Sequence, residues 1–228
     1  MQQLALDLST APAPSLANFE ATGNEQAYAV LSQTLAALGD TPTPVLLWGE
    51  SGCGKTHLLR AVAAQVCAVG LTVAWLDENT QQAPAFDEAW GAVLFDNCDS
   101  WSALQQATAF NWLVSAYGSA QRRKPWVVAA SATPPADWAV RDDLRTRLAQ
   151  GLVFELQALS EDQRLEVLRQ EARARGLVLS DEVVSFMVRR FSRDLGSLMA
   201  LLAHLDDYAL RHQRGLTVPL IKSMLEHE

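Results

Sequence analysis

Short apolar runs alternate with longer amphipathic segments through the first two thirds of the chain. Each run has four to six residues rich in Val, Leu, Ala and Trp, as expected for strands buried on both faces of a sheet. The runs are 45–48, 71–76, 92–96, 126–130 and 152–156, and helical periodicity covers 24–38, 57–69 and 102–117. Strands alternating with helices predict an α/β fold, a parallel sheet flanked by helices.

The pattern becomes entirely helical after residue 159. Ser160 is a typical helix N-cap, and acidic residues follow it in the first turn. Helical periodicity then covers 163–175, 181–190, 194–211 and 218–226. We therefore expect three parts: a flexible tail over 1–15 that ends in a Pro/Ala/Ser linker, an α/β domain over 16–158, and a small all-helical domain over 159–228.

The segment between the first strand and its helix carries a phosphate-binding motif. Its sequence matches the Walker A pattern G-x-x-x-x-G-K-[ST] and consists of Gly49, Glu50, Ser51, Gly52, Cys53, Gly54, Lys55 and Thr56, with His57 next in the helix. Glycines allow successive backbone N–H groups to surround a phosphate. Lys55 would contact the β- and γ-phosphates, and the Thr56 hydroxyl would bind Mg²⁺. The motif predicts a site for ATP or ADP with Mg²⁺.

Polar residues at the ends of later strands suggest the rest of the site. Asp96 ends an apolar strand, which is the Walker B position for a carboxylate that binds Mg²⁺. Asn97 follows where many ATPases have a second acid, and an amide cannot accept a proton from water. Hydrolysis by this chain is therefore expected to be slow, and Asp99 lies too far along to substitute. Ser131 or Thr133 is either a γ-phosphate contact or an ordinary turn residue.

Arginines cluster before the fifth strand. Arg141, Arg145 and Arg147 form either a solvated helix face or the source of an arginine finger, which stabilises charge on a phosphate bound by a neighbouring subunit. Arg193 begins a helix of the second domain and is a further candidate for nucleotide contact.

Composition argues against several classes of protein. The chain has 228 residues and a net charge of −8, which argues against a broad non-specific nucleic-acid surface. We see no signal peptide and no membrane span, so we expect a cytoplasmic protein with no membrane partner. The three cysteines have no spacing typical of a metal site.

With these motifs, the chain resembles AAA+ ATPases, and within them the DnaA-related, Hda-type regulators of chromosomal replication. Gln3, Leu4, Leu6 and Leu8 resemble the family's sliding-clamp-binding hexapeptide, which presents alternate side chains to an apolar groove. The Asp96-Asn97 pair resembles the family's Walker B segment. The segment 143–148 is similar to box VII, which assigns the arginine finger to Arg147. The segment 192–195 is similar to sensor 2, which assigns that role to Arg193.

The resemblance implies a regulator that binds ADP or ATP, docks on the DNA polymerase III sliding clamp and promotes hydrolysis of DnaA-bound ATP, so that initiation is not repeated. Because the sequence stops at residue 228, we expect no helix-turn-helix domain and no sequence-specific DNA binding. A homo-oligomer is also compatible with a finger that acts between subunits. Two alternatives stay open: a helicase-loader-like ATPase on single-stranded DNA, and a nucleotide-dependent tether for another partner.

Overall fold

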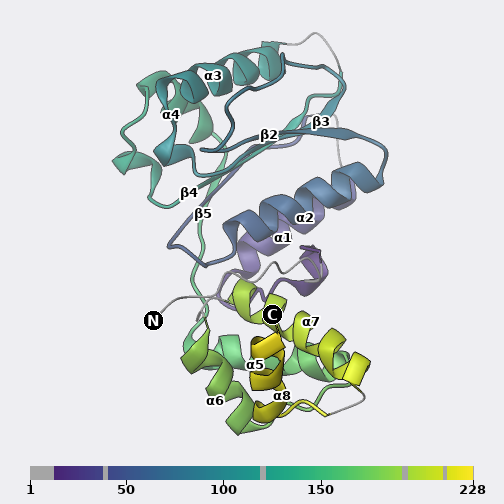
Figure 1. Cartoon of the computed structure of the whole chain (residues 1–228). Helices are drawn as coiled ribbons and strands as arrows, with labels where there is room; N and C mark the ends of the chain where they lie inside the picture. Colours follow the sequence, from purple (N-terminus) through teal and green to yellow (C-terminus); the bar gives the residue numbers. More distant parts are fainter. Residues whose placement is uncertain (1–12, 38–40, 119–121, 192–194, 213–214, 228) are drawn as a thin grey trace. The chain divides into compact units, whose positions relative to one another are not determined.

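The structure is a computed structural model, and it describes residues 13–37, 41–118, 122–191, 195–212 and 215–227. The chain divides into two compact units (Figure 1). One unit comprises Pro14–Ala158 and contains the sheet, and the other contains the helices after Leu159. No helix within the described residues is long and apolar enough to span a membrane.

A five-stranded parallel sheet forms the centre of the first unit. Its strands are β1 (Val45–Trp48), β2 (Thr72–Leu76), β3 (Trp90–Phe95), β4 (Trp126–Ser131) and β5 (Leu152–Glu155). They lie in the order β2-β3-β4-β1-β5. All five apolar runs therefore became strands, and the predicted fold class is confirmed. The order brings the carboxyl ends of β1, β3 and β4 close together at one edge of the sheet.

Helices cover both faces of this sheet (Figure 1). The helices α1 (Glu25–Ala37) and α2 (Lys55–Ala68) pack on one face, where Leu31 and Leu59 meet alternate strand residues such as Leu47. The helices α3 (Ala103–Gly118) and α4 (Asp142–Leu148) pack on the other face. The strands are apolar on both sides because each side contributes to a separate core.

The sequence pattern did not single out α4 as a helix. This helix has seven residues, of which only Leu144 and Leu148 are buried. Two apolar positions are too few to show a helical period, although they are enough to anchor the helix against α3. Three 3-10 turns were also not predicted: η1 (Leu16–Asn18), η2 (Cys98–Ser100) and η3 (Pro135–Asp137).

The second unit consists of four helices around its own core. They are α5 (Glu161–Ala174), α6 (Asp181–Arg190), α7 (Leu195–His212) and α8 (Val218–His227). Ser160 caps α5 through a capping box with Gln163, as its position in the sequence suggested. Leu168, Met187, Leu202 and Ile221, one from each helix, are fully buried in a shared apolar cluster.

Candidate nucleotide-binding site

The loop between β1 and α2 depends on three glycines. Gly49, Gly52 and Gly54 have φ angles of 155°, 83° and 98°, values that other residues rarely adopt. A Cβ atom on Gly49 would lie 2.5 Å from the carbonyl oxygen of Leu156, and one on Gly54 would lie 2.7 Å from the ring of Phe19. Backbone conformation therefore favours glycine at all three positions, and close packing adds to this at Gly49 and Gly54. A glycine loop of this kind can turn successive backbone N–H groups towards an anion.

The ammonium of Lys55 lies inside this loop. Its Nζ donates hydrogen bonds to the carbonyl oxygens of Gly49 (2.6 Å) and Glu50 (2.9 Å), and lies 3.7 Å from Cys53 Sγ. Lys55 is only 7% exposed, which is unusual for a lysine. A buried positive charge at the start of α2, where the helix dipole is also positive, favours an anionic ligand.

Thr56 and Asp96 form the adjacent half of the site. The Thr56 hydroxyl donates to Asp96 Oδ2 at 2.7 Å, so the two residues assigned to Mg²⁺ are brought together. Asp96 directly follows β3 and is 4% exposed. Burial raises the pKa of its carboxyl group above the ordinary value. Hydrogen bonds from the Thr56 hydroxyl and from the backbone N–H of Asn97 lower this pKa and offset the effect of burial only in part. A divalent cation next to the carboxylate would favour its ionised form.

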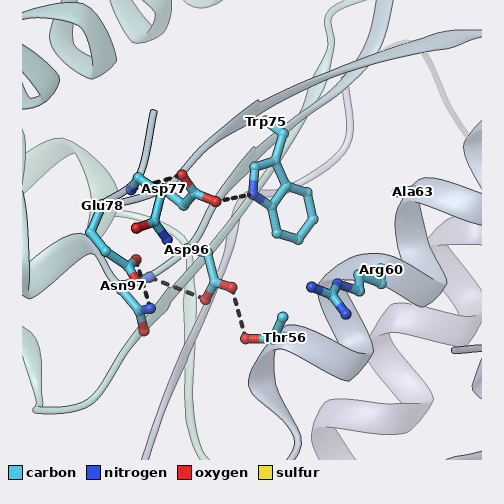
Figure 2. A pocket seen from close by; sticks show the side chains of 9 residues that line it. Thr56, Arg60, Ala63, Trp75, Asp77, Glu78, Asp96 and Asn97 are labelled. Atoms are coloured by element: carbon cyan, nitrogen blue, oxygen red, sulfur yellow. Dashed lines mark hydrogen bonds between the residues drawn. The ribbon is translucent and has the colours of Figure 1, made fainter. Parts of the chain in front are cut away.

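A pocket of about 390 Å³ opens beside this pair (Figure 2). Residues from α2, the end of β2 and the end of β3 line it, and most of them are polar: Thr56, Arg60, Ala63, Trp75, Asp77, Glu78, Asn79, Asp96 and Asn97. Arg60 and the acids at positions 77 and 78 were not among the residues that the sequence suggested. These two acids could have been inferred from the pairing of β2 with β3. Leu76 pairs with Phe95, so the residues that follow the two strands lie side by side.

Asn97 and Glu78 are joined across these two strand ends. The amide Nδ2 of Asn97 donates to Glu78 Oε2 at 2.7 Å (Figure 2). Asn97 has a left-handed backbone with φ 49°, a conformation that asparagine tolerates better than most residues. The amide that stands at the usual position of a second acid therefore contacts a carboxylate from the neighbouring strand.

The remaining polar candidates at the sheet edge have structural partners. Asp99 accepts hydrogen bonds from the backbone N–H groups of Ala132 and Thr133 and from the Thr133 hydroxyl. The fully buried Ser131 hydroxyl donates to the Thr133 carbonyl at 2.8 Å. These contacts favour the interpretation of Ser131 and Thr133 as turn residues, and they occupy the Asp99 carboxylate.

The segment before α1 closes one side of the phosphate loop. The ring of Phe19 contacts Gly54 and lies 5.8 Å from the ring of His57, centroid to centroid. The Nε2 atom of His57 lies 2.9 Å from the carbonyl oxygen of Ser15. Burial lowers the pKa of His57, which favours the neutral form of the ring beside the loop. His57 thus supports the loop through the N-terminal segment.

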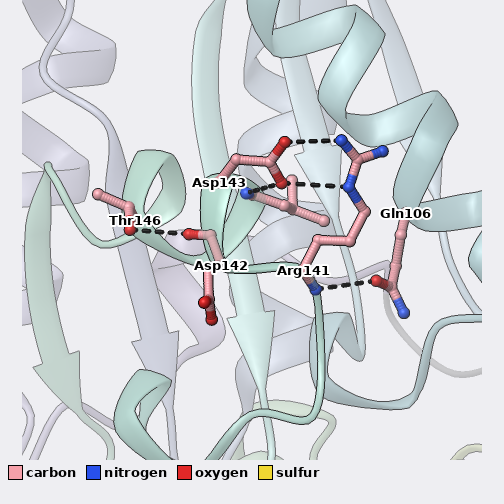
Figure 3. A network of polar contacts seen from close by, with 6 residues as sticks. Gln106, Arg141, Asp142, Asp143 and Thr146 are labelled. Carbon is pink, nitrogen blue, oxygen red and sulfur yellow. Dashed lines mark hydrogen bonds and ion pairs between the residues drawn. The ribbon is translucent and has the colours of Figure 1, made fainter.

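The arginines suggested as fingers lie on and just before α4, which packs against α3. Figure 3 shows the first of them, Arg141, beside Asp143 and Gln106. Arg141 binds Asp143 through two hydrogen bonds of 3.1 and 2.6 Å, and Arg145 binds Asp142 at 2.7 Å. Within the described residues, Arg147 forms no ion pair. Its guanidinium carbon instead lies 5.4 Å from the centre of the Phe110 ring, which Arg141 also approaches at 4.9 Å. Arg147 therefore keeps a positive charge that is not paired with any carboxylate in the described part of its unit.

Some of the suggested site residues lie outside the described residues. They are Arg193 and the tail residues Gln3, Leu4, Leu6 and Leu8.

Comparisons with known proteins give a consistent result. Residues 161–225 match the family model of the Hda lid domain, and residues 16–79 match that of the bacterial DnaA ATPase domain. Together the two matches are consistent with an Hda-type, DnaA-related AAA+ protein. An uncharacterised protein of Haemophilus influenzae is 28% identical over 194 residues, which are 78% of this chain and 80% of that protein.

Solved DnaA structures share the fold. Domain III of DnaA from Thermotoga maritima superposes with a TM-score of 0.70 at 20% identity, covering 93% of this chain and 98% of that one. AMPPCP-bound DnaA from Aquifex aeolicus gives a TM-score of 0.63 at 22% identity, covering 82% of this chain and 64% of that one. These likenesses show that the chain shares the fold of DnaA.

The donor set fits a nucleoside polyphosphate. The glycine loop and Lys55 would hold the phosphates, and Thr56 and Asp96 would hold Mg²⁺. Within the described part of the chain, no group of three or more His, Cys, Asp and Glu side chains is placed to hold a metal by itself. This is consistent with Mg²⁺ binding through one or two protein groups together with phosphate oxygens and water.

Proposed function

We propose that this protein is a nucleotide-binding regulator of chromosomal replication initiation that promotes hydrolysis of ATP bound to DnaA. The observation that carries the proposal is the contrast among the α4 arginines. Arg141 and Arg145 are paired with aspartates, whereas Arg147 has no ion pair among the described residues and lies on an aromatic ring. An arginine finger needs a guanidinium whose charge is available to a phosphate on another subunit.

The chain's own nucleotide has a different role in this proposal. ADP or ATP, held with Mg²⁺ by the phosphate loop, Thr56 and Asp96, sets the conformation in which the regulator binds its partner. Arg193 would contact this nucleotide from the helical domain. Slow turnover fits the amide at position 97, because that side chain cannot accept a proton.

The tail supplies the second contact in the proposal. Gln3, Leu4, Leu6 and Leu8 would bind the sliding clamp as a short extended strand, which brings the regulator to DNA on which the clamp is loaded. Removing residues 1–8 should abolish clamp binding and leave nucleotide affinity unchanged. Clamp affinity that is unchanged by the deletion would show that the tail has no such role.

The direct test is the ratio of ATP to ADP on purified DnaA, followed over time on clamp-loaded DNA with and without this protein. The proposal predicts faster conversion to ADP only when the protein and the clamp are both present. Equal conversion with and without the protein would overturn the proposal. Single-stranded DNA binding, measured by filter retention at two salt concentrations, would instead support a loader-like function.

A further inference from the structure

Glu78 gives the candidate nucleotide site a carboxylate close to position 97, where the Walker B segment has an amide in place of a second acid. It follows β2, and Asn97 follows β3, the neighbouring strand. The two side chains meet at 2.7 Å and line the same pocket as Thr56 and Asp96. An acid therefore lies one hydrogen bond away from the position at which many ATPases carry their catalytic glutamate.

A buried amide holds the backbone of Glu78 in place. The Nε2 atom of Gln105, on α3, lies 2.9 Å from the carbonyl oxygens of Asp77 and Glu78 and 3.3 Å from that of Thr80. Gln105 is 7% exposed, and its Oε1 accepts hydrogen bonds from the backbone and the hydroxyl of Ser102. The start of the β2–β3 loop is therefore anchored to the core rather than free in solvent.

The other two acids of the pocket are engaged by their own surroundings. Asp77 accepts hydrogen bonds from Trp75 Nε1 and from Thr80 within its loop. Asp96 accepts them from Thr56 and from the Asn97 backbone. Glu78 is exposed, and Asn97 is the hydrogen-bond partner that the described residues provide for its carboxylate. Of the three acids, Glu78 accepts the fewest hydrogen bonds from the described residues and is the most exposed, so its carboxylate is the most available to a water molecule.

We propose that Glu78 is the catalytic base for this chain's own slow ATP hydrolysis, with Asn97 orienting its carboxylate. Glu78 removes a proton from the attacking water as the water oxygen bonds to the γ-phosphorus. The bond from the γ-phosphorus to the β,γ-bridging oxygen breaks, which leaves ADP and inorganic phosphate. The proton on Glu78 then passes to solvent, which reaches this exposed side chain. The proposal rests on nucleotide binding by the phosphate loop, as set out in the proposed function.

The test compares Glu78→Gln with Glu88→Gln, an exposed glutamate of the same loop that lies outside the pocket. Two quantities are measured in the full-length protein: single-turnover hydrolysis of bound ATP, and affinity for a non-hydrolysable ATP analogue with Mg²⁺. We expect Glu78→Gln to slow hydrolysis by at least about tenfold, as removal of a general base does, and to leave analogue affinity within about threefold. Glu88→Gln should leave both quantities unchanged.

A third readout follows the nucleotide itself. Protein purified from cells and extracted with acid should release mainly ADP from the unmodified chain and mainly ATP from Glu78→Gln. Hydrolysis that is unchanged in Glu78→Gln, or analogue affinity that falls as much as hydrolysis does, would overturn the role of Glu78 as base. Failure of the unmodified protein to bind the analogue would instead contradict the proposed function.

Discussion

The phosphate loop and the α4 region differ in how their positive charges are held. Lys55 is buried, and its ammonium is surrounded by loop carbonyls in a site that the chain builds for itself. Arg147 is partly exposed and rests on the face of Phe110 without an ion pair among the described residues. The first arrangement suits a ligand bound within this chain. The second suits a phosphate that another molecule brings.

In the proposed function, the two regions have separate roles: one binds this chain's own nucleotide, and the other promotes hydrolysis of a nucleotide on another protein. A charge buried in a glycine loop contributes to nucleotide affinity, and its removal should affect this chain alone. A charge held on an aromatic face contributes little to the chain's own nucleotide site, and its removal should affect only the partner. Substitutions at the phosphate-binding site and at the α4 arginines should therefore have different effects.

Arg147→Ala should have the largest effect. Removing an arginine finger lowers the rate of hydrolysis on the partner by about 10³-fold or more. Release of phosphate from preloaded DnaA measures this rate. Arg145→Ala is the matched control, because Arg145 is paired with Asp142 on the same helix. A similar loss in both variants would mean that the cluster acts through general charge rather than through one finger.

Lys55→Ala should weaken nucleotide binding by this chain on the order of 100-fold, since charge-assisted hydrogen bonds to the phosphates are lost. Titration with a fluorescent ADP analogue measures the affinity. The arginine finger variant should bind the analogue as the unmodified protein does. Nucleotide affinity that survives in Lys55→Ala would contradict the assignment of the phosphate loop.

Phe110→Leu should reduce stimulation of the partner by about three- to tenfold, because a cation–π contact contributes roughly 0.5–1 kcal/mol or more and holds the Arg147 guanidinium in place. Phe110→Tyr keeps the ring face and should retain most of the stimulation. The concentration that gives half-maximal stimulation is measured together with the maximal rate. If leucine and tyrosine behave alike, Phe110 serves only to pack α3 against α4.

Asp96→Asn should give the smallest effect, a modest rise in the thermal unfolding midpoint of the nucleotide-free protein at pH 7. Burial raises the pKa of Asp96 in the folded state, so ionisation of this group costs stability as the pH rises from its unfolded pKa through its folded pKa. The asparagine variant avoids that cost. The difference between the two proteins should therefore shrink as the pH falls through the raised pKa of folded Asp96 and vanish below the ordinary pKa of aspartate, where the group is protonated in both states. Calorimetry across this range would contradict the argument if the difference grew in acid.

Much of the α/β unit could be predicted because its strands and its phosphate loop are each specified by residues that are consecutive in the sequence. Each strand is a continuous apolar run, and the motif from Gly49 to Thr56 specifies a loop, a helix start and a charge within eight residues. Asp96 was found in the same way, as an acid at the end of such a run. Periodicity also indicated the helices α5 to α8, which have several apolar positions each.

The missed features depend on contacts between segments that are distant in the sequence. Glu78 has no motif of its own, and its relation to Asn97 follows from the pairing of β2 with β3. The short helix α4 offers two buried leucines, too few for periodicity. The choice of Arg147 among three arginines came from resemblance to box VII, whereas its contact with Phe110 required the packing of α3 against α4.

The central claim is that this chain promotes hydrolysis of a nucleotide that another protein holds. The most direct measurement loads DnaA with ATP labelled at the γ-phosphate, adds this protein preloaded with unlabelled ADP on clamp-loaded DNA, and follows labelled phosphate. Label should be released rapidly with the unmodified protein and at the basal rate with Arg147→Ala. If the label stays on DnaA in the presence of the unmodified protein, this chain does not promote hydrolysis by DnaA.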